Sequence, residues 1–224
     1  MNRGIKVAIV AFAMMVGFSA MAAEFEVEIT NITRGQTFTP ILVVAHDPDI
    51  ALFKVGEPAL PELAELAESG ATGPLDALLN TLPQVGATAA GTGLLGPGET
   101  TTIVVDAGGK FNQISFAGML IPTNDTFVAI DSVRIPQGNQ RKEVYAIAYD
   151  AGSEANDQNC NNMPGPRCPG GEGASAPADS DEGYVYVGNG FHTLPQGDGG
   201  EILGPQVYDW RNPVARVKIS RVRK

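Results

Sequence analysis

Three carboxylates follow predicted strands at positions where they could act together. Asp125 lies in a Thr-Asn-Asp turn just after a predicted strand that ends at Pro122. Asp150 ends a strand predicted over 143–149, and Glu154 lies four residues further along the same loop. If the two strands are neighbours, the three side chains converge at one end of the sheet. Like charges this close together repel one another by roughly several kcal/mol at a moderate dielectric constant. A bound cation would relieve that repulsion.

Calcium suits such a cluster, because it takes about six to eight oxygen ligands from carboxylates, carbonyls and waters. Gly152 would let the backbone turn sharply, so that the carbonyl of Ala151 faces the ion. The alternative is that Asp125, Asp150 and Glu154 are ordinary turn-forming and capping acids. Both interpretations remain open on the residues alone.

Asp131 is a further acid with two interpretations. It shares a predicted strand face with Phe127, Ala129 and Val133, so it is either a buried hydrogen-bonding carboxylate or a fourth acidic ligand. His46-Asp47 could form half of a general-base pair, although no nucleophile motif accompanies it. An exported metal-assisted hydrolase that uses the acidic cluster with His46 is therefore the alternative function, and a purely structural envelope protein is a third.

The elements that must position these acids are β-rich. The segment from Phe25 to Ile32 alternates apolar and polar residues, which is typical of a half-buried strand, and 40–45 is an apolar run typical of a strand buried on both faces. Further strands are predicted at 100–106, 113–122, 126–135, 143–149, 184–187 and 215–222. The stretch 86–98 is predicted to be a loop.

A short helical insertion interrupts this pattern. Apolar residues recur every three or four positions, at Leu60, Leu63 and then Leu66 and Ala67. Gly70 follows where a helix would be capped. A second short helix is predicted over 74–80, with proline in its first turn. The sequence thus predicts an all-β protein, an antiparallel β-sandwich with a short helical insertion.

The N-terminal segment indicates export, and the charge of the chain limits its partners. Arg3 and Lys6 precede an uncharged apolar run, and Ala20-x-Ala22 has the spacing of a signal-peptidase site, so 1–22 is predicted to be a signal peptide cleaved near Ala22. The net charge of −10 argues against nucleic acid and anionic membrane surfaces as partners. We expect a secreted or periplasmic protein with no membrane insertion after cleavage; an uncleaved N-terminal anchor is the alternative.

Cys160 and Cys168 are the only cysteines, with seven residues between them. In an oxidising compartment such a pair is typical of a disulfide that closes a loop. The surrounding segment 151–183 is rich in Gly, Pro, Ser, Asn and Asp and is predicted to hold no core of its own.

Three segments together resemble the spondin N-terminal domain, the module found in F-spondin and mindin. They are SFAGMLIPTNDTFVAIDS at 115–132, AYDAGSE at 148–154 and NPVARV at 212–217. The resemblance implies one domain over 23–224, a secreted C2-like β-sandwich with a calcium site at one end and no enzymatic activity. It also implies a role in cell adhesion or extracellular recognition, with an unidentified protein or glycan as ligand. Glu154 departs from the family pattern, which has Asp there.

Overall fold

The computed structural model describes residues 23–171, 182–196 and 200–223. The predicted signal peptide at 1–22 lies outside these residues. The elements in chain order are β1 (Ala23–Asn31), β2 (Thr37–Phe38), β3 (Leu42–His46), α1 (Pro61–Ser69), α2 (Gly73–Leu79), β4 (Val85–Ala90), β5 (Thr100–Ala107), β6 (Gln113–Ile121), β7 (Thr126–Arg134), β8 (Arg141–Asp150), the 3-10 turn η1 (Cys160–Asn162), β9 (Tyr186–Val187), α3 (Pro205–Tyr208) and β10 (Ala215–Arg221).

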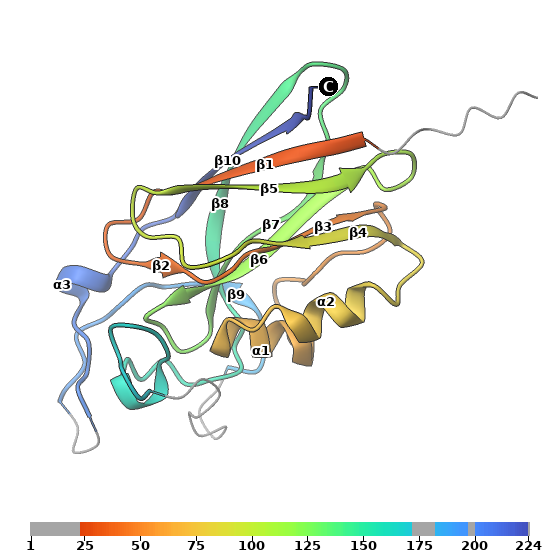
Figure 1. The fold of residues 1–224 in the computed structure, drawn as a ribbon. Helices are drawn as coiled ribbons and strands as arrows, with labels where there is room; N and C mark the ends of the chain where they lie inside the picture. The colour runs from red at the N-terminus through yellow and green to blue at the C-terminus, as the bar shows by residue number, and fades with distance from the viewer. Residues whose placement is uncertain (1–22, 172–181, 197–199, 224) are drawn as a thin grey trace, which may run out of the picture.

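The described strands form one antiparallel sheet in the order β4-β3-β6-β7-β8-β10-β1-β5, with β2 pairing with β6 and β9 with β8. The first and last strands in this order, β4 and β5, lie against each other without pairing (Figure 1). The sheet therefore curls into a nearly closed barrel or sandwich. The prediction of an all-β antiparallel fold is confirmed.

Two apolar clusters cover the two faces of this sheet. The inner cluster is filled by the alternating side chains of β1, Phe25, Val27 and Ile29, which are all buried. The outer cluster lies beneath the helices, where Leu63 and Leu66 of α1 pack on β6 and β7. Burying side chains of this size contributes about 1.5–3 kcal/mol each. The helical insertion thus covers one face of the sheet, as Figure 1 shows.

The structure corrects two expectations. The stretch 86–98, predicted to be a loop, overlaps strand β4, which pairs with β3 although its residues are small. The polar segment 151–183 was predicted to hold no core of its own, and its Met163 and Cys168 pack into the inner cluster. Val133 does not share a face with Phe127, because Asp131 and Ser132 together lie opposite a single residue of β6 and form a β-bulge.

Candidate functional site

Asp125 and Asp150 are adjacent at one end of the paired strands β7 and β8. Thr126, the first residue of β7, lies opposite Asp150, the last residue of β8. The amide of Ala151 donates to the carbonyl of Asp125 at 3.1 Å, so the pairing extends one step into the turn. The two acids converge, but not because the strands that precede them are neighbours, since β7 lies between β6 and β8. They converge because Asp125 directly precedes β7, which pairs with β8.

The loop after β8 folds back onto the Asp125 side chain, which is 0 % exposed. Its Oδ2 accepts hydrogen bonds from the amide of Ser153 at 2.8 Å and from the amide of Glu154 at 3.0 Å. Its Oδ1 is buried and has no hydrogen-bond partner among the described residues. An unsatisfied buried carboxylate oxygen costs free energy, so this atom marks a place where a ligand would stabilise the protein.

The other two acids are buried beside it. Asp150 is 2 % exposed, and its carboxylate accepts from the amide of Gly152 at 2.9 Å and from Nδ2 of Asn156 at 2.9 Å. Glu154 is 2 % exposed as well. The structure therefore brings Asp125, Asp150 and Glu154 to the same loop end, and none of the three side chains faces solvent.

Burial controls the ionisation of this cluster. Burial, together with the charge of Asp150, raises the pKa of Asp125 to about 8, although the backbone amides of Ser153 and Glu154 oppose the rise. The pKa of Asp150 is raised by burial to about 6, although hydrogen bonds from Asn156 and Gly152 oppose the rise. Neither carboxylate forms an ion pair with a Lys, Arg or His of the described residues. A proton held on Asp125, or a cation bound beside the two acids, would each avoid the cost of burying both charges.

Gly152 makes the turn that carries these amides. Its φ is +66°, and a Cβ added there would lie 2.2 Å from the carbonyl oxygen of Tyr184. The carbonyl of Gly152 accepts from the amide of Gly183 at 2.8 Å, so the loop is held on the segment that leads into β9. Glycine is required at this position both for its conformation and for the close approach of the neighbouring backbone.

Residues from distant segments complete the surroundings of Asp150. Asn156 Nδ2 also donates to the hydroxyl of Tyr186 at 2.9 Å, and that hydroxyl donates to Glu182 at 3.1 Å. Burial and the charges of Asp150 and Glu182 raise the pKa of Tyr186. These residues, with His192 and Trp210, border a cavity of about 170 Å³ that reaches Asp150. Sequence reasoning missed Asn156, Tyr186 and Glu182, because no local pattern links them to the acids.

Helix α1 contributes a further acid that the sequence analysis did not single out. The Ser153 side chain lies 3.3 Å from Oδ2 of Asp125 and also forms a hydrogen bond with Glu68 of α1. Burial raises the pKa of Glu68, this hydrogen bond lowers it, and the charge of Glu65 raises it. The helical insertion thus reaches the loop that follows β8.

Asp131 and His46 lie apart from this cluster. Asp131 is six residues along β7 from Asp125, which corresponds to about 20 Å in a strand. Its Oδ1 accepts from the hydroxyl of Ser115 at 3.0 Å, and His46 Nε2 lies 2.7 Å from the same hydroxyl. The serine, and not the histidine, contacts the aspartate, and Ser115 and His46 are fully buried. The arrangement is a hydrogen-bonded core network, and it differs from a nucleophile–base–acid relay.

The acidic side chains do not form a ready coordination shell. Within 23–171, 182–196 and 200–223, no group of three or more His, Cys, Asp or Glu is arranged so that it could hold a metal ion. The donor chemistry nevertheless fits calcium, since the groups that converge are hard oxygen ligands and one of them, Oδ1 of Asp125, lacks a partner among the described residues.

The disulfide predicted between Cys160 and Cys168 is present. It closes the segment that follows the acidic loop, and Cys168 is buried in the inner apolar cluster. The loop after Asp150 is thereby fixed at a second point. None of the helices in the described part of the chain has the length and apolar character needed to cross a membrane.

Comparison with protein families decides the relationship of this chain. The spondin N-terminal (Spondin_N) family model matches residues 24–162, which is more than half of the sequence. The chain belongs to the spondin N-terminal domain family. The match includes the segments 115–132 and 148–154, which carry Asp125, Asp150 and Glu154, whereas 212–217 lies beyond it. A comparison with curated proteins gives no match.

Membership defines the general character of the protein. Spondin N-terminal domains are in general a non-catalytic, extracellular type of domain. The disulfide agrees with this setting, because disulfides persist mainly in oxidising compartments outside the cytosol. Family and disulfide together indicate an extracellular location for this spondin domain.

Proposed function

We propose that the spondin domain is a secreted or periplasmic calcium-binding module for adhesion or extracellular recognition. The observation that carries the proposal is the buried Oδ1 of Asp125, which has no hydrogen-bond partner among the described residues although two more acids are buried beside it. Calcium would bind Asp125, Asp150 and Glu154, with the carbonyl of Ala151 as a backbone ligand. Export, with signal cleavage near Ala22, would place the domain where calcium is abundant.

The metal would order loops and would do no chemistry. The three acids lie on the segments that join β6 to β7 and β8 to the disulfide loop, so an ion bound between them would fix two connections at once. The side chains would have to be drawn together by the ion, because repulsion keeps metal-free carboxylates apart. A rigid loop end is a surface that an unidentified envelope protein or glycan could recognise at a low entropic cost.

A calcium titration of the purified protein tests this proposal. The thermal midpoint should rise with calcium concentration, because a ligand at about 100 times its Kd stabilises the native state by about 2.7 kcal/mol. Magnesium at the same concentration should act more weakly, since it demands a regular octahedral shell and gives up its waters reluctantly. A midpoint that stays constant in saturating calcium would refute the metal site.

A further inference from the structure

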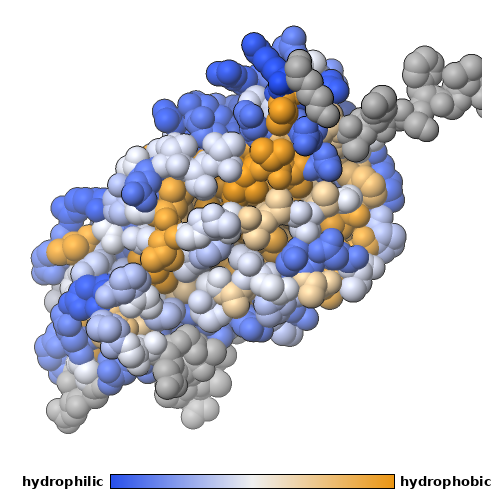
Figure 2. Space-filling view, in the orientation of Figure 1, coloured by the Kyte–Doolittle hydropathy of each residue, from blue (hydrophilic) through white to orange (hydrophobic). Residues whose placement is uncertain are grey.

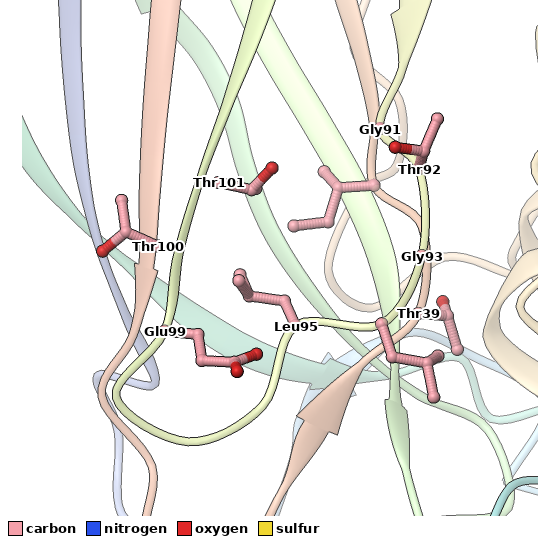
Figure 3. Close-up of a pocket in the computed structure, with 10 residues that line it drawn as sticks. Thr39, Gly91, Thr92, Gly93, Leu95, Glu99, Thr100 and Thr101 are labelled. Atoms are coloured by element: carbon pink, nitrogen blue, oxygen red, sulfur yellow. The ribbon is translucent and has the colours of Figure 1, made fainter.

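A second hollow lies where the two end strands of the sheet meet, and no part of the acidic cluster lines it. This seam cavity has a volume of about 380 Å³. It is enclosed by the first residues of β5, by the segment 91–95 that follows β4, and by the approach to β3 at Thr39 and Ile41 (Figure 3). Figure 2 shows that apolar surface gathers on this side of the molecule around β5. The volume lies in the range of small-molecule sites.

Hydroxyl groups face one another across the seam cavity. Figure 3 shows Thr101 on β5 and Thr92 on the opposite segment, each with its hydroxyl directed into the space between them, whereas Thr100 points away. Thr39 also borders the cavity, but its side chain is turned toward Gly70 and toward Met119, whose amide donates to its Oγ1 at 3.0 Å. A hydroxyl both donates and accepts, so Thr92 and Thr101 could each bond a ligand in either role.

A carboxylate is held at one end of the same space. Oε2 of Glu99 accepts from the amide of Gly96 at 2.7 Å, which fixes the side chain beside Leu95 (Figure 3). The residues that line the cavity include no Lys, Arg or His. This rules out a phosphate, a carboxylate or a sulfated glycan as the preferred ligand, because each needs a cationic partner.

The rest of the lining is apolar. Ile41 and Leu95 are buried in the wall, and Leu94 is 49 % exposed beside them. Gly93 has no atom within 4 Å of the position that a Cβ would take, so the backbone there is open to a ligand. These apolar groups are the smaller part of the lining, and the larger polar part suits a ligand that is rich in hydroxyls.

We propose that the seam cavity binds a neutral sugar residue. A pyranose presents hydroxyls around its rim and an apolar C–H face, and the cavity offers the complementary set. The carboxylate of Glu99 would accept from sugar hydroxyls, the hydroxyls of Thr92 and Thr101 would donate to them, and Leu94 and Leu95 would cover the C–H face. Glycan recognition would thereby be assigned to a part of the domain that shares no lining residue with the acidic cluster.

Saturation-transfer difference NMR and calorimetry on the purified protein test this inference. The probes are methyl β-D-glucopyranoside, methyl β-D-galactopyranoside and N-acetylglucosamine, with n-butylamine as a cationic probe. At least one sugar should bind. Thr101→Val and Glu99→Gln should each weaken its Kd about tenfold, which is the effect of losing one hydrogen bond to a ligand. Thr102→Val is the matched control, because Thr102 is an exposed threonine of the same strand that does not line the cavity, and it should leave the Kd within about twofold.

Two results would overturn the proposal. One is that none of the three sugars binds. If n-butylamine alone binds, and Glu99→Gln abolishes its binding, the cavity takes a cationic ligand instead. The other is a sugar affinity that neither Thr101→Val nor Glu99→Gln changes. Sugar binding should be equal in calcium and in EDTA, so failure of the calcium proposal and failure of the sugar site are separate outcomes.

Discussion

The amide of Glu154 donates to Oδ2 of Asp125 at 3.0 Å, which folds the loop after β8 onto the turn before β7. The two residues are far apart in the chain but lie at the ends of paired strands. A carboxyl side chain is thus held in the core by backbone donors, and its second oxygen has no partner among the described residues. Each prediction about the acidic cluster depends on this contact.

Replacing Asp125 by Asn should abolish the response to calcium. Asn keeps the shape of the side chain and one acceptor for the amides of Ser153 and Glu154 but removes the charge that a cation needs. We expect the calcium-induced rise in thermal midpoint to disappear, and calorimetry to detect no binding in the concentration range that saturates the wild type.

Asp131→Asn is the matched control for this variant. Asp131 lies on the same strand but contacts Ser115 and the amide of Leu52 at the far end. The change should lower stability by about 1 kcal/mol because one hydrogen-bond network is weakened. The calcium response should remain. Loss of the response in Asp131→Asn, or its persistence in Asp125→Asn, would contradict the assigned ligands.

Metal-free protein should lose stability as the pH rises from about 4 to about 8. Burial raises the pKa of Asp125 from an ordinary 3.8 to about 8, so in this window the native state holds a proton that the unfolded chain has released. Stability therefore falls with pH, by about 1.4 kcal/mol per pH unit for one such proton. The raised pKa of Asp150, about 6, adds to the fall at the acidic end.

Urea unfolding in EDTA, compared with urea unfolding in saturating calcium, measures this dependence. Calcium displaces the proton, so the decline should vanish when the metal is present. Asp125→Asn should remove the fall between about pH 6 and pH 8 and leave the smaller fall that Asp150 causes at the acidic end. A stability that stays constant between pH 5 and pH 8 in EDTA would show that the native state holds these carboxylates ionised and would contradict the prediction.

The sequence predicted most strands because their side chains alternate. Phe25, Val27 and Ile29 have the period of a half-buried strand, and their burial follows that pattern. Strand β4 was missed because its residues are small, and small residues are poor strand formers in local terms. It is a strand because β3 offers it a pairing edge, which is information that only the tertiary fold supplies.

The same distinction applies to the candidate site. Asp125 follows β6, which β7 separates from β8, so the neighbouring strands that the sequence analysis assumed are not the ones that bring the acids together. Asp125 lies beside Asp150 because it directly precedes β7, which pairs with β8. Tyr186 and Glu182 approach Asp150 only through the pairing of β9 with β8, which joins segments separated by the disulfide loop. The sequence alone could have separated Asp131 from the acidic cluster, because six residues along a strand place it about 20 Å from Asp125.

His46 should be a stability residue. Its Nε2 lies 2.7 Å from Ser115 Oγ and its Nδ1 lies 2.7 Å from the carbonyl of Asp47, all in the core. His46→Ala leaves these groups unsatisfied next to a cavity, so we expect a loss of about 2–4 kcal/mol in urea unfolding. The calcium-induced shift in midpoint should be unchanged. A variant as stable as the wild type, or one that no longer responds to calcium, would contradict this role.

Gly152→Ala should damage both stability and calcium binding. The φ of Gly152 is +66°, and an added Cβ would lie 2.2 Å from the carbonyl oxygen of Tyr184, which belongs to the backbone and has no side-chain freedom to move aside. We expect a loss of at least about 2 kcal/mol in urea unfolding. Because the turn at Gly152 aims the amides of Ser153 and Glu154 at Asp125, the apparent Kd for calcium should also rise.

Gly138→Ala separates the effect of conformation from that of the clash. Gly138 lies in the turn between β7 and β8 with a φ of +59°, and no atom lies within 4 Å of its added Cβ. Its replacement carries only the strain of a left-handed conformation, about 1–2 kcal/mol, and should leave calcium affinity unchanged. If the two variants lose the same stability and bind calcium equally, the close approach of Tyr184 to Gly152 has no role in shaping the site.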